Sequence, residues 1–268
     1  MNIFLILLLV AGIIGMVFGL IKGKQGVSWG SKLAVACVVL TVGVIIFSWM
    51  MPAGSLQRQV AEFLEKDQQY QHVIGEKVGR MLADEMPGSQ ILVIADAEKS
   101  YKLDGLKNGL AGRATVEAVF PDLENYIRRN FAGQPEQVSS MVEEQRGLPF
   151  PSELVDETIK SANMRPDSLV FLCSLPFDYE RLSIWRDRRQ PDVILASGED
   201  IWNIPDIIRD IENGNITAMV VHKQVSGILR QPIPQDTEEA FSKRYALVTR
   251  DNMDSIMERY PNLLMSGF

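Results

Sequence analysis

The sequence predicts an α/β protein: a transmembrane hairpin of two helices, then a juxtamembrane helix, then a doubly wound, mostly parallel sheet of five to six strands. Two observations lead to this prediction. Two long runs near the N-terminus contain no charged side chain, and after residue 90 short Val/Ile/Leu runs alternate with helical segments. Continuous apolar runs are typical of strands covered on both faces, and their alternation with helices favours parallel pairing. We therefore expect three segments, at residues 1–54, 55–88 and 89–268.

The hairpin is predicted from Ile3–Ile21 and Leu33–Met51, which are 19 residues each. As a helix, each run would extend roughly 28 Å, close to the ~30 Å hydrocarbon thickness of a bilayer. The alternative for the first run is a cleaved signal peptide, but no basic residue precedes it and it exceeds the usual apolar length of about 7–15 residues. The alternative for the second run is a buried core helix. Gly15, Gly19 and Gly23 share one helix face and predict that the first helix packs closely on the second.

The lysines between the two runs predict which side of the membrane the rest of the chain occupies. Lys22, Lys24 and Lys32 lie in or beside the turn, which has no acidic residue. Positive charge in short loops favours the cytoplasmic side. Arg58 and Lys66 follow the second run and weaken this bias. We expect an integral protein of the bacterial inner membrane, with the following domain in the periplasm or outside the cell.

Charge and cysteine content exclude several classes of function. The first 54 residues hold three of the 27 basic residues and no acidic one, so the remaining chain carries 24 basic and 34 acidic side chains. Such an acidic domain argues against nucleic-acid binding, which needs a basic face. The two cysteines are Cys37, inside an apolar run, and Cys173. They form neither a disulfide framework nor a Cys/His metal pattern, so we expect no metal and no cofactor.

Residues 55–86 read as one amphipathic helix, because their apolar side chains recur every three to four positions. Asp67 and Lys77 interrupt this apolar stripe. A coiled coil would need cleaner positions over several heptads. We therefore favour a helix that packs back on its own domain over one that pairs with another chain.

The domain that follows is predicted element by element. Strands are expected at Ile91–Ala95, Val116–Phe120, Leu169–Cys173, Val193–Ala196, Ala218–Val221 and Ala246–Thr249. Helices are expected at Tyr101–Arg113, Leu123–Phe131, Glu136–Glu144, Pro151–Asn163, Tyr179–Arg188, Ile204–Asn213 and Asn252–Tyr260. The connection Lys223–Arg244 contains two prolines, and at this length it reads as a lid-like loop or a disordered excursion.

Candidate site residues follow from the sheet itself. In open parallel sheets, ligands bind beyond the carboxyl ends of the strands, where the strand order reverses. The polar residues just past the predicted strands are Asp96, Ser174, Ser197, Glu199, Asp200, His222 and Lys223. Their carboxylates, hydroxyls, imidazole and ammonium suit a hydroxyl-rich small ligand or acid–base chemistry. The alternative is that such residues only cap helices, as Ser and Asp commonly do.

Two stretches carry a resemblance to a known family. The run ILVIAD, the helix LDGLKNGLAGR and the run VEAVF resemble the opening strand–helix–strand of type I periplasmic sugar-binding receptors. In that family a Gly-Leu-x-x-Gly-Leu helix follows the first strand, and here it is Gly105-Leu106 and Gly109-Leu110. The stretch PDVILASGEDIWNIPDIIRDIENGNITAMVV is similar to a later unit of the family. The resemblance implies the fold of one lobe, whereas the family closes two lobes on its ligand.

These observations predict a membrane-anchored, extracytoplasmic binding module with a sensing or accessory role. Its expected partners are the bilayer, a small molecule and a membrane protein that would carry any signal. The alternatives are a membrane-tethered enzyme that uses the strand-end carboxylates or His222, and a structural subunit of the envelope. The chain has no Gly-x-Gly-x-x-Gly, phosphate-loop or Gly-x-Ser-x-Gly motif, which favours the non-enzymatic interpretations.

Overall fold

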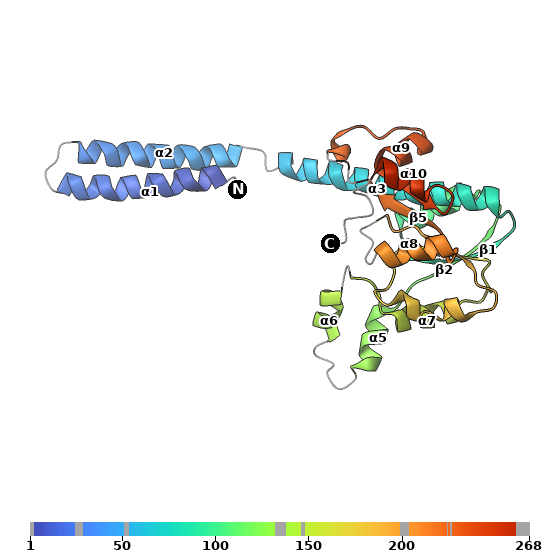
Figure 1. Ribbon diagram of the computed structural model, residues 1–268. Helices are drawn as coiled ribbons and strands as arrows, with labels where there is room; N and C mark the ends of the chain where they lie inside the picture. The colour runs from blue at the N-terminus through green and yellow to red at the C-terminus, as the bar shows by residue number, and fades with distance from the viewer. Residues whose placement is uncertain are drawn as a thin grey trace. The chain divides into compact units, whose positions relative to one another are not determined.

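The computed structural model describes residues 3–24, 29–50, 54–131, 138–145, 148–198, 204–223, 225 and 227–260 (Figure 1). The chain divides into two compact units, Met1–Glu62 and Phe63–Phe268.

The first unit contains two antiparallel helices, α1 (Ile3–Lys24) and α2 (Gly30–Met50). Glycines of α1 face α2: a Cβ at Gly15 would lie 2.7 Å from Cys37 Sγ, and one at Gly19 would lie 2.7 Å from the backbone nitrogen of Ala34. The predicted close packing of the first helix on the second is therefore confirmed. Because Gly19 has no side chain, the backbone of α2 can approach the backbone of α1 at this position, and a larger residue would prevent this.

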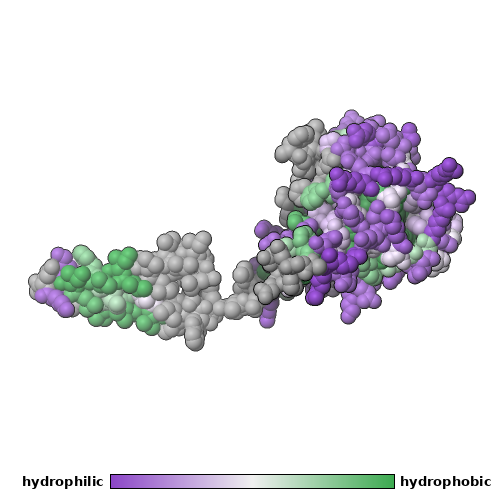
Figure 2. All heavy atoms as spheres, turned by 90° about the horizontal axis from the view of Figure 1, so that it is seen from below, coloured by the Kyte–Doolittle hydropathy of each residue, from purple (hydrophilic) through white to green (hydrophobic). Residues whose placement is uncertain are grey.

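The described part of the hairpin carries large apolar side chains on its outside (Figure 2). These exposed residues are Ile13, Ile14, Val17, Phe18, Leu20, Ile21, Val35, Val38, Val39 and Val42. Among the residues that the structure describes, no helix is both long enough and apolar enough to cross a membrane. The two predicted spans are therefore not confirmed.

The second unit is built on a sheet of six strands. The strands are β1 (Gln90–Ile94), β2 (Thr115–Val119), β3 (Ser168–Phe171), β4 (Asp192–Leu195), β5 (Ile216–His222) and β6 (Tyr245–Thr249). Their order across the sheet is β2-β1-β3-β4-β5-β6. All neighbours pair in parallel except β5 and β6, which are antiparallel. The prediction of a mostly parallel sheet of five to six strands is confirmed.

Helices cover both faces of this sheet. The described helices after the hairpin are α3 (Gly54–Glu85), α4 (Tyr101–Leu110), α5 (Leu123–Asn130), α6 (Val138–Gln145), α7 (Ser152–Lys160), α8 (Ile204–Asn213), α9 (Thr237–Arg244) and α10 (Met253–Arg259). Alternate strand side chains point to opposite faces, so Val93 and Val170 join one core whereas Leu92 and Leu169 join the other. The first core includes α3, α4 and α9, and the second includes α7, α8 and α10. The sheet is therefore doubly wound, as predicted.

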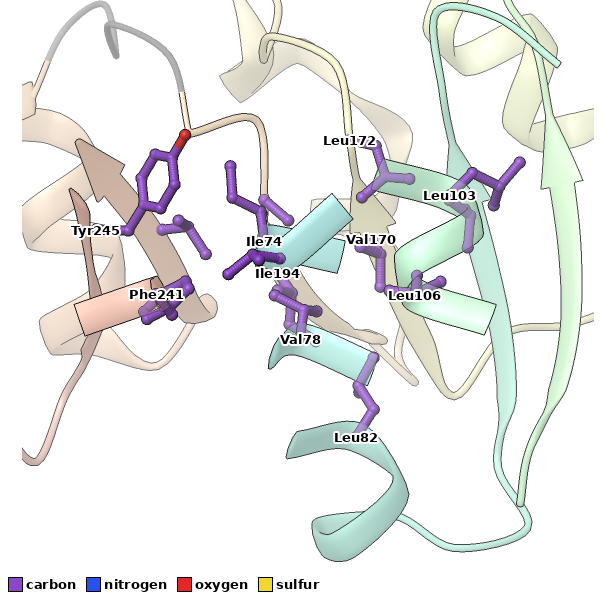
Figure 3. Close-up of a cluster of buried hydrophobic side chains, with 14 of the residues drawn as sticks. Ile74, Val78, Leu82, Leu103, Leu106, Val170, Leu172, Ile194, Phe241 and Tyr245 are labelled. Carbon is purple, nitrogen blue, oxygen red and sulfur yellow. The ribbon is translucent and has the colours of Figure 1, made fainter. Parts of the chain in front are cut away.

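From Phe63 onward, helix α3 is a structural part of the second unit. Tyr70, Ile74, Val78 and Leu82 have at most 1% of their surface exposed. Figure 3 shows Ile74, Val78 and Leu82 between Leu103 and Leu106 of α4 on one side and Phe241 and Tyr245 on the other. The helix therefore packs back on its own domain, the alternative that the interrupted apolar stripe favoured.

Two segments differ from the sequence prediction. The helix expected at Tyr179–Arg188 is instead two short 3-10 turns, η2 (Tyr179–Arg181) and η3 (Ser183–Arg186). Side chains take the backbone groups that a helix would use: Trp185 Nε1 donates to the carbonyl of Tyr179 at 2.7 Å, and the Asp156 carboxylate accepts from the backbone nitrogen of Ser183 at 2.9 Å.

The connection predicted as a loop or disordered excursion at Lys223–Arg244 contains helix α9 and the short turn η4 (Ile228–Arg230). Asp236 caps α9 by accepting a hydrogen bond from the backbone nitrogen of Glu239 at 2.8 Å. An Asp followed three residues later by Glu is the pattern of a helix start, so the sequence carried a signal for this helix. The prolines in the middle of the connection obscured it.

Candidate ligand-binding site

The strand order places a reversal point between β1 and β3. From β1 the chain moves outward to β2 on one side, then crosses back to β3 on the other side of β1. The connections that leave β1 and β3 therefore diverge to opposite sides, and a crevice opens at their carboxyl ends. The residues that follow these two strands, Asp96 and Leu172 to Ser174, lie at this crevice.

A cavity of about 390 Å³ occupies this position. Its walls come from the ends of β1, β2 and β3, the first turn of α4, α6 and the segment before α7. The lining residues are Asp96, Lys102, Pro121, Leu123, Val142, Gln145, Leu148, Pro149, Phe150, Leu172, Cys173 and Ser174. The lining therefore combines polar groups, among them a carboxylate, an ammonium and a hydroxyl, with apolar side chains.

The most buried charge in the cavity wall is the ammonium of Lys102. This residue has 7% of its surface exposed, and its Nζ donates a hydrogen bond to the carbonyl of Leu172 at 3.2 Å. A buried ammonium is costly unless hydrogen-bond acceptors surround it. The cavity lining thus includes a buried hydrogen-bond donor together with Asp96 and Ser174, and an oxygen-rich ligand would supply further acceptors.

The predicted site residues separate into groups. Asp96 and Ser174 line the cavity together, Asp96 being exposed and Ser174 half-buried. Ser197 is buried just past β4 and does not line this cavity. Glu199 and Asp200 lie outside the described residues. For all of them a role in binding stays a prediction.

His222 and Lys223 lie at the end of β5, in a different set of contacts. Arg244 Nε donates to His222 Nε2 at 3.0 Å, so that ring nitrogen carries no proton in this arrangement. The ammonium of Lys223 lies 5.0 Å from the centre of the Tyr260 ring and donates to the carbonyl of Ser242. Neither residue lines the cavity that holds Asp96. Of the predicted site residues that the structure describes, Asp96 and Ser174 share a cavity, whereas Ser197, His222 and Lys223 do not line it.

Arg244 organises this second set of contacts. Its guanidinium forms an ion pair with Asp67 at 2.6 Å and lies over the ring of Tyr70, 4.9 Å from the centroid. Burial raises the pKa of the Tyr70 phenol, and the Arg244 cation partly offsets that shift. Tyr70 and Tyr245 also make an edge-to-face contact, with ring centres 6.2 Å apart. This arrangement ties α3 to β5 and β6 and reads as structural support.

Sequence reasoning missed Lys102. Its signal was present, because Lys102 shares the buried face of the predicted helix with Leu103, Leu106 and Leu110. A lysine on an otherwise apolar helix face, just after the first strand, predicts a buried charge near the carboxyl end of that strand. Among the described residues, no group of three His, Cys, Asp or Glu side chains is placed to hold a metal ion.

Comparisons with known proteins find likeness only in structure. No protein-family model matches the chain, and no curated protein sequence matches it. AraP, an arabinose binding protein from Geobacillus stearothermophilus, is 11% identical with a TM-score of 0.41, over 69% of this chain and 62% of that one. A carbohydrate transporter from Acidothermus cellulolyticus 11B, in complex with myo-inositol, is 12% identical with a TM-score of 0.38, over 72% and 62%.

A structure titled XylFII-LytSN complex is 10% identical with a TM-score of 0.40, over 68% of this chain and 61% of that one. This chain spans less than two thirds of each of these three proteins. AraP is titled a sugar-binding protein and the Acidothermus structure a carbohydrate transporter, which agrees with the weak resemblance predicted from the sequence, at TM-scores below 0.5. The identity of a ligand does not follow from it.

Proposed function

We propose that this protein is a membrane-anchored module that binds a small, hydroxyl-rich molecule in the cavity between the carboxyl ends of β1 and β3. The observation that carries the proposal is the cavity itself, which lies at the reversal point of the strand order and combines polar and apolar walls. Its volume of about 390 Å³ falls within the range of about 300–1,000 Å³ that is common for small-molecule sites.

The chemistry of the walls indicates the class of ligand. Asp96 supplies acceptors for hydroxyl groups, Lys102 supplies donors, and the hydroxyl of Ser174 can do either. Leu148 and Phe150 contribute apolar surface to the cavity lining. A molecule with several hydroxyl groups and a C–H face, such as a sugar or polyol, would satisfy both kinds of wall.

Anchoring in a membrane is the second part of the proposal. Two features support it: the uncharged 19-residue runs Ile3–Ile21 and Leu33–Met51, and the large apolar side chains exposed on the described part of the hairpin. The described face of the second unit in Figure 2 is instead mostly hydrophilic. Water would solvate the hairpin's apolar exterior poorly, and lipid would cover it. The lysines of the turn favour the cytoplasmic side, which would leave the second unit outside the cytoplasm.

Binding is tested with the full chain in detergent micelles. Thermal melts against sugars, polyols, sugar acids and nucleosides would identify compounds that stabilise the protein, and calorimetric titration would give their affinities. We expect at least one hydroxyl-rich compound to bind. Asp96→Asn should lower the affinity for that compound by about tenfold or more, because one or two hydrogen bonds to a charged group are lost.

The matched control is Glu98→Gln, which changes an exposed carboxylate two residues further along that does not line the cavity. This variant should bind as the wild type does. If no compound binds, or if Glu98→Gln loses as much affinity as Asp96→Asn, the cavity is not the binding site.

A further inference from the structure

Helices α3 and α4 touch through their backbones. Gly75 and Gly79 of α3 face Gly105 and Gly109 of α4. A Cβ at Gly75 would lie 2.7 Å from the backbone nitrogen of Leu106 and would overlap the carbonyl oxygen of Lys102. A Cβ at Gly105 would likewise overlap the carbonyl oxygen of His72. The contact is thus backbone against backbone, and glycine is what permits it.

The two helix backbones are in close contact at all four glycines. Each of the four glycines has backbone atoms of the other helix within 3.0 Å of the place where a Cβ would be. Side chains can change rotamer to absorb a small shift, but two helix backbones in contact can only move together or separate. Close-packed interiors transmit such displacements for the same reason. A movement of the first turns of α4 is therefore passed directly to α3.

Lys102 belongs to both the cavity and this contact. Its side chain lines the cavity and donates to the carbonyl of Leu172. Its own carbonyl is the backbone atom nearest to a Cβ built on Gly75. One residue therefore connects the ligand cavity, through a single turn of α4, to the middle of α3.

Helix α3 is held on its other side as well. Tyr70, Ile74 and Val78 are buried against the sheet, and Asp67 pairs with Arg244. Figure 3 shows α3 enclosed between the α4 side chains and those of Phe241 and Tyr245. The helix also continues, without a break, to Gly54, so it is the covalent route from the second unit toward residues 1–53.

We propose that Lys102 is a coupling residue, which converts occupancy of the cavity into a displacement of α3 through the glycine contact. The ammonium has three N–H donors, so a ligand oxygen can accept from it alongside the carbonyl of Leu172. Attraction of the side chain toward the ligand would shift the first turn of α4. This inference rests on the proposed function, because it takes the cavity to be the binding site. By this route, binding of a ligand in the cavity would change the position of α3.

The first arm of the test needs no ligand. Amide hydrogen–deuterium exchange is measured on the full chain in micelles for wild type and Lys102→Met, which keeps the aliphatic stem but removes the ammonium. We expect exchange in the part of α3 around Gly75 to rise about threefold or more, while β5 and α8 keep wild-type protection. Lys107→Met is the matched control, because Lys107 is an exposed lysine of the same helix that does not line the cavity.

Lys102→Arg separates coupling from packing. It retains a cationic donor near Leu172 and should leave exchange in α3 close to the wild-type rate. If Lys102→Met leaves α3 unchanged, raises exchange equally in all elements, or behaves like Lys107→Met, the coupling proposal is wrong, whether or not a ligand is found.

The second arm uses D-glucose, D-xylose and myo-inositol as probes. Where a probe binds, exchange in the part of α3 around Gly75 should change in the wild type, while β5 and α8 keep their protection. Binding without any change in α3 would overturn the coupling and leave the proposed function standing. Absence of binding, together with a local effect of Lys102→Met on α3, would leave the coupling standing and count against the proposed function.

Discussion

Arg244 and Asp67 form an ion pair with 2.6 Å between Nη2 and Oδ1, although 177 residues separate them in the sequence. The Arg244 side chain is 12% exposed and the Asp67 side chain 34%. Asp67 is one of the two charges that interrupt the apolar stripe of α3. Asp67 thus has a structural role, because its ion pair with Arg244 joins α3 to the end of α9. Arg244 also donates to His222, which extends the connection to β5.

We expect Asp67→Asn to destabilise the second unit by about 1–3 kcal/mol, because it leaves the buried guanidinium without its counter-charge. The estimate is below that for a fully buried pair, since water screens the partly exposed carboxylate. Urea unfolding followed by tryptophan fluorescence measures the change. Glu124→Gln is the control: its pair with Arg128 is exposed on both sides and should contribute at most about 0.5 kcal/mol. Equal effects of the two variants would contradict this account.

The phenol of Tyr179 donates to the Asp210 carboxylate at 2.8 Å, and the residue is 2% exposed. We expect Tyr179→Phe to cost about 1–2 kcal/mol, because Asp210 loses a donor from a buried group. Burial raises the pKa of Tyr179, and the hydrogen bond to Asp210 raises it further. Because the folded-state pKa lies above the unfolded value of about 10, this contribution is complete below pH ~10 and is lost as the pH rises above it.

Tyrosinate absorbance checks the ionisation of Tyr179. Near pH 11 the folded wild type and the folded Tyr179→Phe variant should absorb equally, whereas in urea the wild type should show one more tyrosinate. An extra tyrosinate in the folded wild type would show that the phenol is accessible and would contradict the burial described here.

Strand positions were predictable because most strands are short apolar runs, and β1 and β3 are buried on both faces. The sheet order was not, since nothing in the sequence states which strands are neighbours. For the site, the carboxyl-edge rule found Asp96 and Ser174. The rule could not find Lys102, because that residue lies on a helix. It also grouped Asp96 and Ser174 with His222 and Lys223, which lie at the end of β5, two strands beyond β3. The 3-10 turns at 179–186 escaped prediction because Trp185 and Asp156, and not local propensity, satisfy their backbone.

The hairpin gives a prediction about membrane association. The full chain should pellet with membranes and resist extraction at high pH. Val39→Glu places a charge on a side chain that is 66% exposed on α2, at a cost of about 2.5–3.5 kcal/mol if that position faces lipid. We expect this variant to be extracted more readily than the wild type. Val225→Glu, at an exposed position of the second unit, should behave as the wild type. A wild-type chain released by alkaline washing would refute the membrane anchor.

The lysines of the turn predict the side of the membrane. Protease added to intact bacterial spheroplasts should digest the second unit, because Lys22, Lys24 and Lys32 would hold the turn in the cytoplasm. Full protection before lysis and digestion after it would place the second unit in the cytoplasm, and the ligand would then be an intracellular molecule.

The location of the ligand is tested most directly by filling the cavity. Ser174→Tyr introduces a large side chain at a half-buried cavity residue, and Ser139→Tyr makes the same change at an exposed serine of α6 that does not line the cavity. Calorimetric titration of the full chain with the best hydroxyl-rich compound is compared for the two variants. We predict that Ser174→Tyr abolishes binding while its melting temperature stays near that of Ser139→Tyr, which binds as the wild type does. Undiminished binding by a folded Ser174→Tyr protein would show that the ligand binds elsewhere.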